Sequence, residues 1–193
     1  MVIVVYGGNA SGKSALAEEL AEKLSARQRD ASEAKVYLAT MQRDGSPEAE
    51  ERIAKHRSLR EGKGFVTVEC PRNLPADCTL PKDASVVLLE DVGNLVANEL
   101  FGNGKSGQSA AEEVTQAVTS EIEWLLSEAE HTVVVTNNIF DGGIEIEETM
   151  RRYTEVLGAV NQWLAKRCGV FVESVCGLPH VLKGQPLFEE INR

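Results

Sequence analysis

The segment 7–14 constrains the fold of this chain more than any other part of it. Its residues, Gly7-Gly8-Asn9-Ala10-Ser11-Gly12-Lys13-Ser14, fit the pattern G-x-x-x-x-G-K-[ST] of a phosphate-binding loop. An apolar run at 2–5 precedes the loop, and a helix-like stretch at 15–24 follows it. A strand, a glycine-rich loop and a helix in this order are the context that the motif requires, so we expect a nucleoside phosphate site here.

The residue types of this loop match the chemistry of a phosphate site. Glycines let backbone N–H groups close around phosphate oxygens, and the following helix presents the positive end of its dipole to the same anion. Lys13 is expected to contact the β- and γ-phosphates, and the Ser14 hydroxyl to ligate Mg²⁺. The alternative is a glycine-rich turn that binds nothing, but the complete motif in its complete context favours the phosphate site.

Strand-like and helix-like stretches alternate along the rest of the chain. Continuous apolar runs, such as 86–89 and 133–135, are typical of buried parallel strands. The alternation predicts one α/β domain over 1–184, a doubly wound, mostly parallel sheet with helices on both faces, as in P-loop nucleoside triphosphatases. Residues 185–193 follow a glycine and are expected to form a loose tail. The expected strands are 2–6, 35–39, 65–69, 85–90, 132–136 and 170–174, and the expected helices are 14–27, 47–61, 92–101, 110–129 and 147–167.

Composition excludes several classes of protein. The net charge of −10 argues against general nucleic-acid binding, which needs a basic face. The longest apolar runs are about five or six residues, whereas a membrane-spanning helix needs roughly 20. The N-terminus lacks the pattern of a signal peptide, so we expect a cytoplasmic protein. The four cysteines lack C-x-x-C spacing, which favours reduced thiols over a zinc site.

A second phosphate-handling element is expected at the end of another buried strand. A carboxylate in that position commonly holds Mg²⁺ directly or through water. Glu90 and Asp91 both follow the apolar run 86–89, and either could serve. Asp91 is also well suited to cap the helix that follows. We therefore favour Glu90 as the active-site carboxylate.

His56 lies in a basic window of this acidic chain. If residues 47–61 are helical, Arg52, His56 and Arg60 share one face, away from Ile53. Neighbouring arginines would hydrogen-bond phosphoryl oxygens and disfavour the imidazolium form. A neutral imidazole can attack phosphorus and form a phosphoramidate. From the residues alone, the alternative is that these basic side chains form a solvent-exposed helix face without a catalytic role.

Taken in order, these elements resemble the bifunctional adenosylcobinamide kinase / adenosylcobinamide-phosphate guanylyltransferase family of cobalamin biosynthesis. Tyr37-Leu38-Ala39-Thr40 is similar to the family's Y-I-A-T, and Arg52-Ile53-Ala54-Lys55-His56-Arg57 to its R-I-x-x-H-[RK]. Further similar stretches lie at 67–69, 88–90, 135–137, 158–165 and 177–179. The order and spacing of these stretches, together with the first loop, carry the resemblance.

The resemblance implies two reactions. The family phosphorylates the aminopropanol hydroxyl of adenosylcobinamide with a nucleoside triphosphate, GTP or ATP. It then moves GMP from GTP onto a histidine, here His56, and on to the new phosphate, which gives adenosyl-GDP-cobinamide. The catalytic residues implied are His56 and Lys13, and the metal ligands are Ser14 and Glu90 with Mg²⁺. The implied nucleotide contacts are residues 7–14, Leu38, Ala39, Thr40, Arg57, Ser58, Leu59, Arg60, Glu69 and Glu90.

Partners follow from the same resemblance. We expect small-molecule substrates, no nucleic acid and no membrane span, and a homo-oligomer, because family members are typically trimeric. Residues 137–146 depart from the family pattern: Asn138 stands where the family has Glu, and a Pro is missing. The segment after Glu90 also differs. Two rival functions are a small-molecule kinase without guanylyl transfer and a nucleotide-dependent switch protein, although no Asn-Lys-x-Asp stretch is present.

Overall fold

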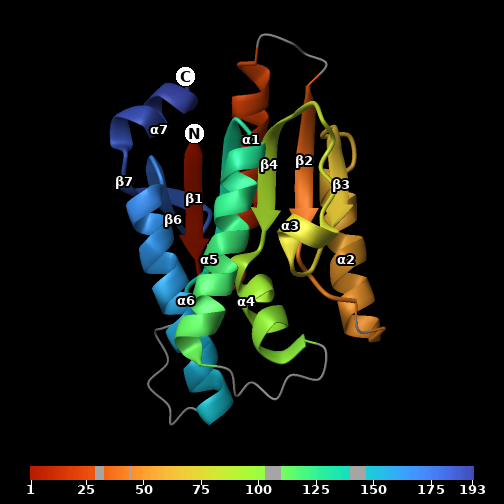
Figure 1. Cartoon of the computed structure of the whole chain (residues 1–193). Coiled ribbons are helices and arrows are strands. Elements are labelled where there is room, and N and C mark those ends of the chain that lie inside the picture. The colour runs from red at the N-terminus through yellow and green to blue at the C-terminus, as the bar shows by residue number, and fades with distance from the viewer. Residues whose placement is uncertain (29–32, 44, 103–109, 140–146) are drawn as a thin grey trace.

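A seven-stranded sheet forms the centre of the computed structural model (Figure 1), in the order β3-β2-β4-β5-β1-β6-β7. The structure describes residues 1–28, 33–43, 45–102, 110–139 and 147–193, without the side chains of 48–50, 52, 55, 56 and 59. The strands are β1 (Val2–Gly7), β2 (Ala34–Ala39), β3 (Phe65–Glu69), β4 (Ala84–Glu90), β5 (His131–Asn137), β6 (Val170–Val175) and β7 (Leu178–Lys183). The helices are α1 (Lys13–Ala26), α2 (Pro47–Arg60), α3 (Leu74–Asp77), α4 (Val92–Phe101), α5 (Ala111–Glu128), α6 (Glu148–Arg167) and α7 (Gln185–Ile191).

The first six strands are parallel, and this brings their carboxyl ends to one edge of the sheet. β1 lies between β5 and β6, with Val4 opposite both Val134 and Phe171. The central strands are rich in valine and leucine because both of their faces are buried. The edge therefore collects the residues that follow β1, β2, β3, β4 and β5, which is where ligands bind in sheets of this kind.

Helices cover both faces of the sheet, as expected. On one face, α1 packs against β1, β4 and β5 through residues such as Leu20, and α7 packs against α1, β6 and β7 through residues such as Phe188. On the other face, α4, α5 and α6 form a second cluster with side chains such as Leu95, Ile122 and Leu157. The predicted α/β class and the predicted strands and helices are confirmed, with ends shifted by at most one residue.

Three elements of the structure were not predicted from the sequence. α3 is a single turn, β7 pairs antiparallel with β6, and α7 occupies the segment expected to be a loose tail. The expectation of a loose tail was wrong, because Phe188 and Ile191 are 8% and 3% exposed and pack in the core with α1. β7 contains Pro179 and is mostly exposed, so its pattern did not resemble a buried strand.

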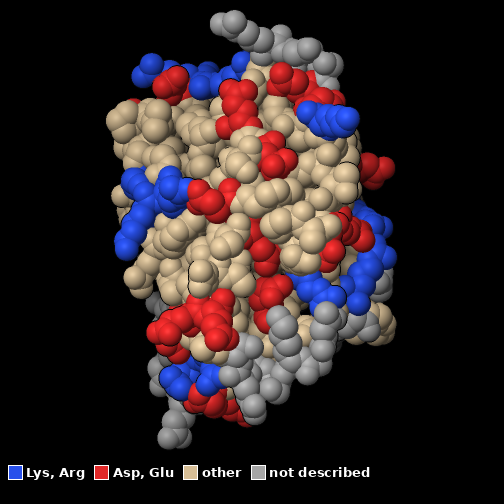
Figure 2. Space-filling model, viewed as in Figure 1, with Lys and Arg blue, Asp and Glu red and all other residues tan. Residues whose placement is uncertain are grey.

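The surface over α5 is acidic. This helix exposes Glu112, Glu113, Glu123 and Glu128 and carries no lysine or arginine. Figure 2 shows acidic side chains distributed along this face, with the blue side chains in separate groups. Within the described ranges, no helix has the length and apolar character needed to cross a membrane.

Removing the Phe188 ring tests whether α7 belongs to the folded core. We expect Phe188→Ala to lower the free energy of unfolding by about 3 kcal/mol, since a buried ring is replaced by a cavity. Leu187 is 41% exposed on the same helix and serves as the control. Leu187→Ala should change the free energy by less than about 1 kcal/mol, measured by urea unfolding. Equal effects of the two substitutions would mean that α7 is not docked as described.

Candidate functional site

The phosphate-binding loop connects the end of β1 to the first turn of α1. Its backbone turns through two residues of positive φ, Ala10 at 56° and Gly12 at 92°. The Ser11 N–H donates to the Gly8 carbonyl at 3.3 Å, which closes the turn. Helix α1 begins at Lys13, so its first amide groups and the positive end of its dipole face the loop. The predicted residues 7–14 thus form one continuous cradle.

The β6–β7 turn supports this cradle from one side. The Ser11 carbonyl accepts hydrogen bonds from the Ser174 hydroxyl and from the Gly177 N–H, each at 2.8 Å. A Cβ on Gly12 would lie 3.0 Å from the Gly177 Cα. Such a close approach of two backbones leaves room only for glycine. The loop conformation is therefore held by packing as well as by its own turn.

Ser14 connects the loop to the second predicted element. Its hydroxyl donates a 2.7 Å hydrogen bond to Oε1 of Glu90, at the end of β4. Oε2 of Glu90 is buried and has no partner among the described residues. Lys13 is 9% exposed, and its Nζ lies 3.4 Å from the Gly8 carbonyl, folded back over the loop. Lys13, Ser14 and Glu90 therefore gather where phosphates would bind.

The two candidate carboxylates have different surroundings. Asp91 caps α4, since its Oδ1 accepts the Asn94 N–H at 2.7 Å. Burial, followed by the nearby negative charge of Asp91, raises the pKa of Glu90 to about 8, although Ser14 and Lys13 act in the opposite direction. A buried carboxylate with an unpartnered oxygen next to a serine hydroxyl fits a Mg²⁺ site, because this ion prefers hard oxygen ligands. Ser14 and Glu90 are the residues that would hold it.

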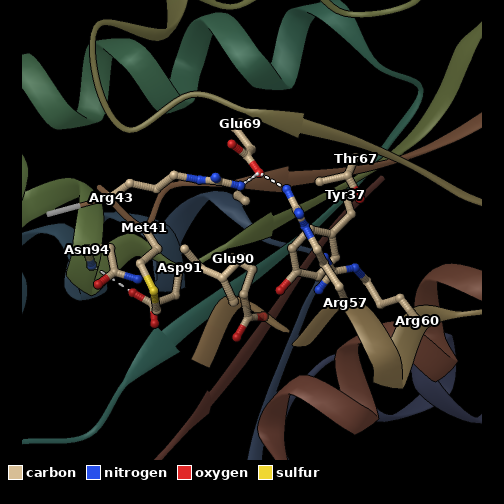
Figure 3. Close-up of a pocket in the computed structure, with 12 residues that line it drawn as sticks. Tyr37, Met41, Arg43, Arg57, Arg60, Thr67, Glu69, Glu90, Asp91 and Asn94 are labelled. Atoms are coloured by element: carbon tan, nitrogen blue, oxygen red, sulfur yellow. Dashed lines mark hydrogen bonds and ion pairs between the residues drawn. The ribbon is translucent and has the colours of Figure 1, made fainter. Parts of the chain in front are cut away.

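A pocket extends from Glu90 toward β3 and α2 (Figure 3). It is lined by Tyr37, Ala39, Met41, Arg43, Ile53, Arg57, Arg60, Thr67, Glu69, Glu90, Asp91 and Asn94. Figure 3 shows Arg43 and Arg57 reaching Glu69 from opposite sides, with nitrogen–oxygen distances of 2.9 and 2.5 Å. Burial acts to raise the pKa of Glu69, but the hydrogen bonds from Arg57 and Arg43 outweigh it and hold the pKa below its usual value.

The face of α2 that borders the pocket differs from the one expected. The pocket is lined by Ile53, Arg57 and Arg60, which lie at i, i+4 and i+7. Ile53, expected to point away from the functional face, lines the pocket. His56 lies on the same helix, but its side chain and that of Leu59 are outside the described part of the structure.

The remaining predicted contacts fall into two groups. Leu38 and Thr40 are fully buried: Leu38 packs in the core, and the Thr40 hydroxyl donates to the Asp91 carbonyl at 2.7 Å. Their side chains are structural, and Ala39 between them lines the pocket. Ser58 is exposed and lines a second groove, on the surface between α2 and β3, together with Arg57 and Phe65.

The altered family segment lies partly beside the cradle. The Asn138 N–H donates to the Gly7 carbonyl at 2.9 Å, so the loop after β5 lies against the phosphate-binding loop. Residues 140–146 of that segment are outside the described residues.

Six pocket residues were missed by the sequence analysis: Tyr37, Met41, Arg43, Ile53, Thr67 and Asn94. Tyr37, Ile53 and Thr67 belonged to quoted stretches but were assigned no binding role. Arg43 follows the stretch that begins at Tyr37 by three residues, and a basic residue after a strand end was a usable signal. Met41 and Asn94 carry no sequence signal of a binding role, because only the folded chain brings the segment after β2 and the first turn of α4 to the same pocket.

Two glycines of the loop provide a matched test of the cradle. We expect Gly12→Ala to lower the free energy of unfolding by about 2 kcal/mol, because the position has positive φ and faces the Gly177 backbone. Gly8 has open space at its Cβ position, so Gly8→Ala should stay within about 1 kcal/mol of the wild type. Thermal unfolding without nucleotide measures both. A destabilised Gly8→Ala beside an unaffected Gly12→Ala would contradict the described loop.

The chain is similar to known proteins over most of its length. Residues 3–182 match the model of the family described as "Cobinamide kinase / cobinamide phosphate guanyltransferase". The bifunctional adenosylcobalamin biosynthesis protein CobP of Pseudomonas aeruginosa is 32% identical over 185 residues, covering 95% of this chain and 98% of that protein. The bifunctional adenosylcobalamin biosynthesis protein CobU of Salmonella typhimurium is 33% identical over 177 residues, covering 86% of this chain and 90% of that protein.

Among solved structures, the KaiC-like protein PH0186 of Pyrococcus horikoshii OT3 aligns with a TM-score of 0.47 and 10% identity, over 89% of this chain and 71% of that one. The family match covers nearly the whole chain, including the phosphate-binding loop, α2 and Glu90. The chain therefore belongs to the cobinamide kinase / cobinamide phosphate guanyltransferase family, whose bifunctional members act in adenosylcobalamin biosynthesis.

Proposed function

We propose that both reactions of this family use the phosphate-binding loop, and that His56 carries the guanylyl group between them. The observation that carries this proposal is the Ser14–Glu90 hydrogen bond, which joins the cradle to a pocket bordered by α2, the helix of His56. A single nucleotide could then contact the cradle through its phosphates and the arginine-lined pocket through its remaining groups.

In the kinase reaction, the hydroxyl of adenosylcobinamide attacks the γ-phosphorus of the nucleoside triphosphate. The new O–P bond replaces the bond to the β-phosphate oxygen, the hydroxyl proton is lost to solvent, and the nucleoside diphosphate leaves. Lys13 and the amide groups of the loop stabilise the charge that develops on the transferred group. The buried position of Lys13 strengthens this interaction, because few water molecules screen it.

In the guanylyl transfer, a neutral His56 nitrogen attacks the α-phosphorus of GTP. The N–P bond forms as the bond to the β-phosphate oxygen breaks, and pyrophosphate leaves. The phosphate of the corrinoid then attacks the same phosphorus and displaces the histidine, which gives adenosyl-GDP-cobinamide. Arg57 and Arg60 are suited to neutralise charge on these phosphates, since both line the pocket.

Mg²⁺ is the proposed metal, held by Ser14 and Glu90. When bound, it would neutralise negative charge on the phosphates. Glu90 must lose its proton to bind the cation, and the cation would then supply the partner that its buried Oε2 lacks among the described residues.

We further propose a homo-oligomer, as the family resemblance implies, acting in the cytoplasm where nucleoside triphosphates are available. Large apolar side chains are exposed on β6 and β7, and a subunit interface would cover them: Val175, Leu178 and Leu182. Light scattering measures the mass in solution, and a trimer corresponds to three chains of 21.0 kDa.

Labelled GTP tests the role of His56. We expect α-labelled GTP, but not γ-labelled GTP, to leave one acid-labile, base-stable GMP on the protein. His56→Ala should abolish this label and retain kinase activity within about tenfold, because the γ-phosphoryl transfer does not use the imidazole. Lys13→Ala should lower both activities by at least about a hundredfold.

The alternative outcomes discriminate between functions. Kinase activity without any trapped label in the wild type would indicate a small-molecule kinase that lacks guanylyl transfer. GTP binding without turnover, with or without cobinamide, would indicate a nucleotide-dependent switch.

Metal titration tests the role of Glu90. We expect Glu90→Ala to raise the Mg²⁺ concentration needed for half-maximal kinase activity by at least about tenfold, because one oxygen ligand is lost. Glu112 is exposed on α5, far along the chain from the loop, and Glu112→Ala is the control. An unchanged Mg²⁺ requirement in Glu90→Ala would refute the metal site.

A further inference from the structure

Arg60 places a buried positive charge in the pocket. The residue is 8% exposed, and its Nη1 has no hydrogen-bond partner among the described residues. A buried charge is costly unless an opposite charge or hydrogen bonds compensate for it. Arg60 lines the same pocket as Glu90, which the Ser14 hydrogen bond connects to the cradle. A phosphate of a bound nucleotide would supply the missing acceptor.

Tyr37 holds the guanidinium of Arg60 without using its donors. The Arg60 Cζ lies 3.5 Å from the centroid of the Tyr37 ring, and Figure 3 shows the side chain extending over that ring. The N–H groups of a guanidinium lie in its plane, so stacking on a ring face leaves them available for phosphate oxygens. An ion pair with a carboxylate would instead occupy two of them.

The Tyr37 ring is itself rigidly placed. It is 3% exposed on β2, and its ring packs edge-on against Phe65 of β3, with centroids 6.2 Å apart and an interplanar angle of 81°. A tyrosine fixed between two strands and a helix cannot change rotamer without opening the core. The stacking surface offered to Arg60 is therefore preorganised.

A second connection fixes the backbone of Arg60. Its carbonyl accepts the Lys63 N–H at 3.1 Å, and Lys63 Nζ pairs with Glu18 of α1 at 2.5 Å. The Glu18 side chain is 4% exposed. Because α1 also begins at the phosphate-binding loop, this pair ties the end of α2 to the helix that carries Lys13 and Ser14.

We propose that Tyr37 is a positioning residue, which holds the Arg60 guanidinium against its ring face so that the unpartnered N–H groups bind a phosphate of the nucleotide. The proposal rests on the proposed function in that a nucleotide occupies the pocket. It does not depend on the guanylyl-histidine step.

A double-mutant cycle on GTP affinity tests this inference, with Mg²⁺ present, the whole chain used throughout, and the α,β-methylene analogue in place of GTP so that no GMP is transferred to the protein. We expect Tyr37→Leu to weaken GTP binding about tenfold and Arg60→Ala about thirtyfold, measured by titration calorimetry. Tyr37→Phe keeps the ring and is the matched control, so it should bind GTP within about twofold of the wild type. In the Arg60→Ala background, Tyr37→Leu should add less than about twofold, because its effect acts through Arg60.

Arg60→Lys provides a test that leaves the core ring in place. Lysine keeps the charge but lacks the planar, stacked fork, and we expect binding to fall at least about tenfold. Thermal unfolding establishes that each variant is folded. Wild-type affinity in Arg60→Lys, or a Tyr37→Leu effect of the same size with and without Arg60, would overturn the inference.

The GMP label of the wild type reports separately on the proposed function. A wild type that takes no label, combined with the expected cycle on GTP affinity, would reject guanylyl transfer and leave the role of Tyr37 supported. A labelled wild type with no coupling between Tyr37 and Arg60 would support guanylyl transfer and reject the positioning role of Tyr37.

Discussion

A carboxylate buried at the end of β4 needs a polar partner, and that requirement holds the two parts of the site together. Glu90 receives the Ser14 hydroxyl from the first turn of α1 on one side, and it lines the arginine-rich pocket on the other. Burial of a charged group in a protein is costly, so a site of this kind persists only where the fold supplies compensation. Here the parallel sheet supplies it, because the strands that carry the loop and the carboxylate end at the same edge.

Positive charge near Glu90 is distributed in two different ways. Arg43 and Arg57 are exposed and paired with Glu69, so each of them can exchange that partner for another anion at little cost. Arg60 is buried and stacked on an aromatic ring, so its charge stays in place whether or not an anion is present. The pocket thus combines the fixed positive charge of Arg60 with two arginines whose charge is already compensated by Glu69. This compensation limits the electrostatic repulsion among the three side chains.

Much of the fold was predictable, because buried parallel strands leave continuous apolar runs and the phosphate-binding loop requires a strand before it and a helix after it. The cap role of Asp91 and the tie between Glu90 and the loop also followed from residue type and position. β7 and α7 were missed, since an exposed edge strand with Pro179 and a helix of two turns lack periodic patterns. The pocket face of α2 was misjudged for a different reason. Helical spacing groups residues into faces, but only the folded chain shows that Arg57 contacts Glu69 of β3 and that Arg60 contacts Tyr37 of β2.

The support that the β6–β7 turn gives to Ser11 has a consequence for the order of events in synthesis. β1 pairs with β5 and β6, strands that are synthesised more than 120 residues later. The loop after β1 accepts hydrogen bonds from Ser174 and Gly177. Contacts between such distant segments form late in folding, because long stretches of chain must first be brought together. The phosphate-binding loop therefore cannot acquire its full set of supporting contacts before Gly177 has been synthesised. A nascent chain would not hold nucleotide in this cradle until the β6–β7 turn had emerged from the ribosome.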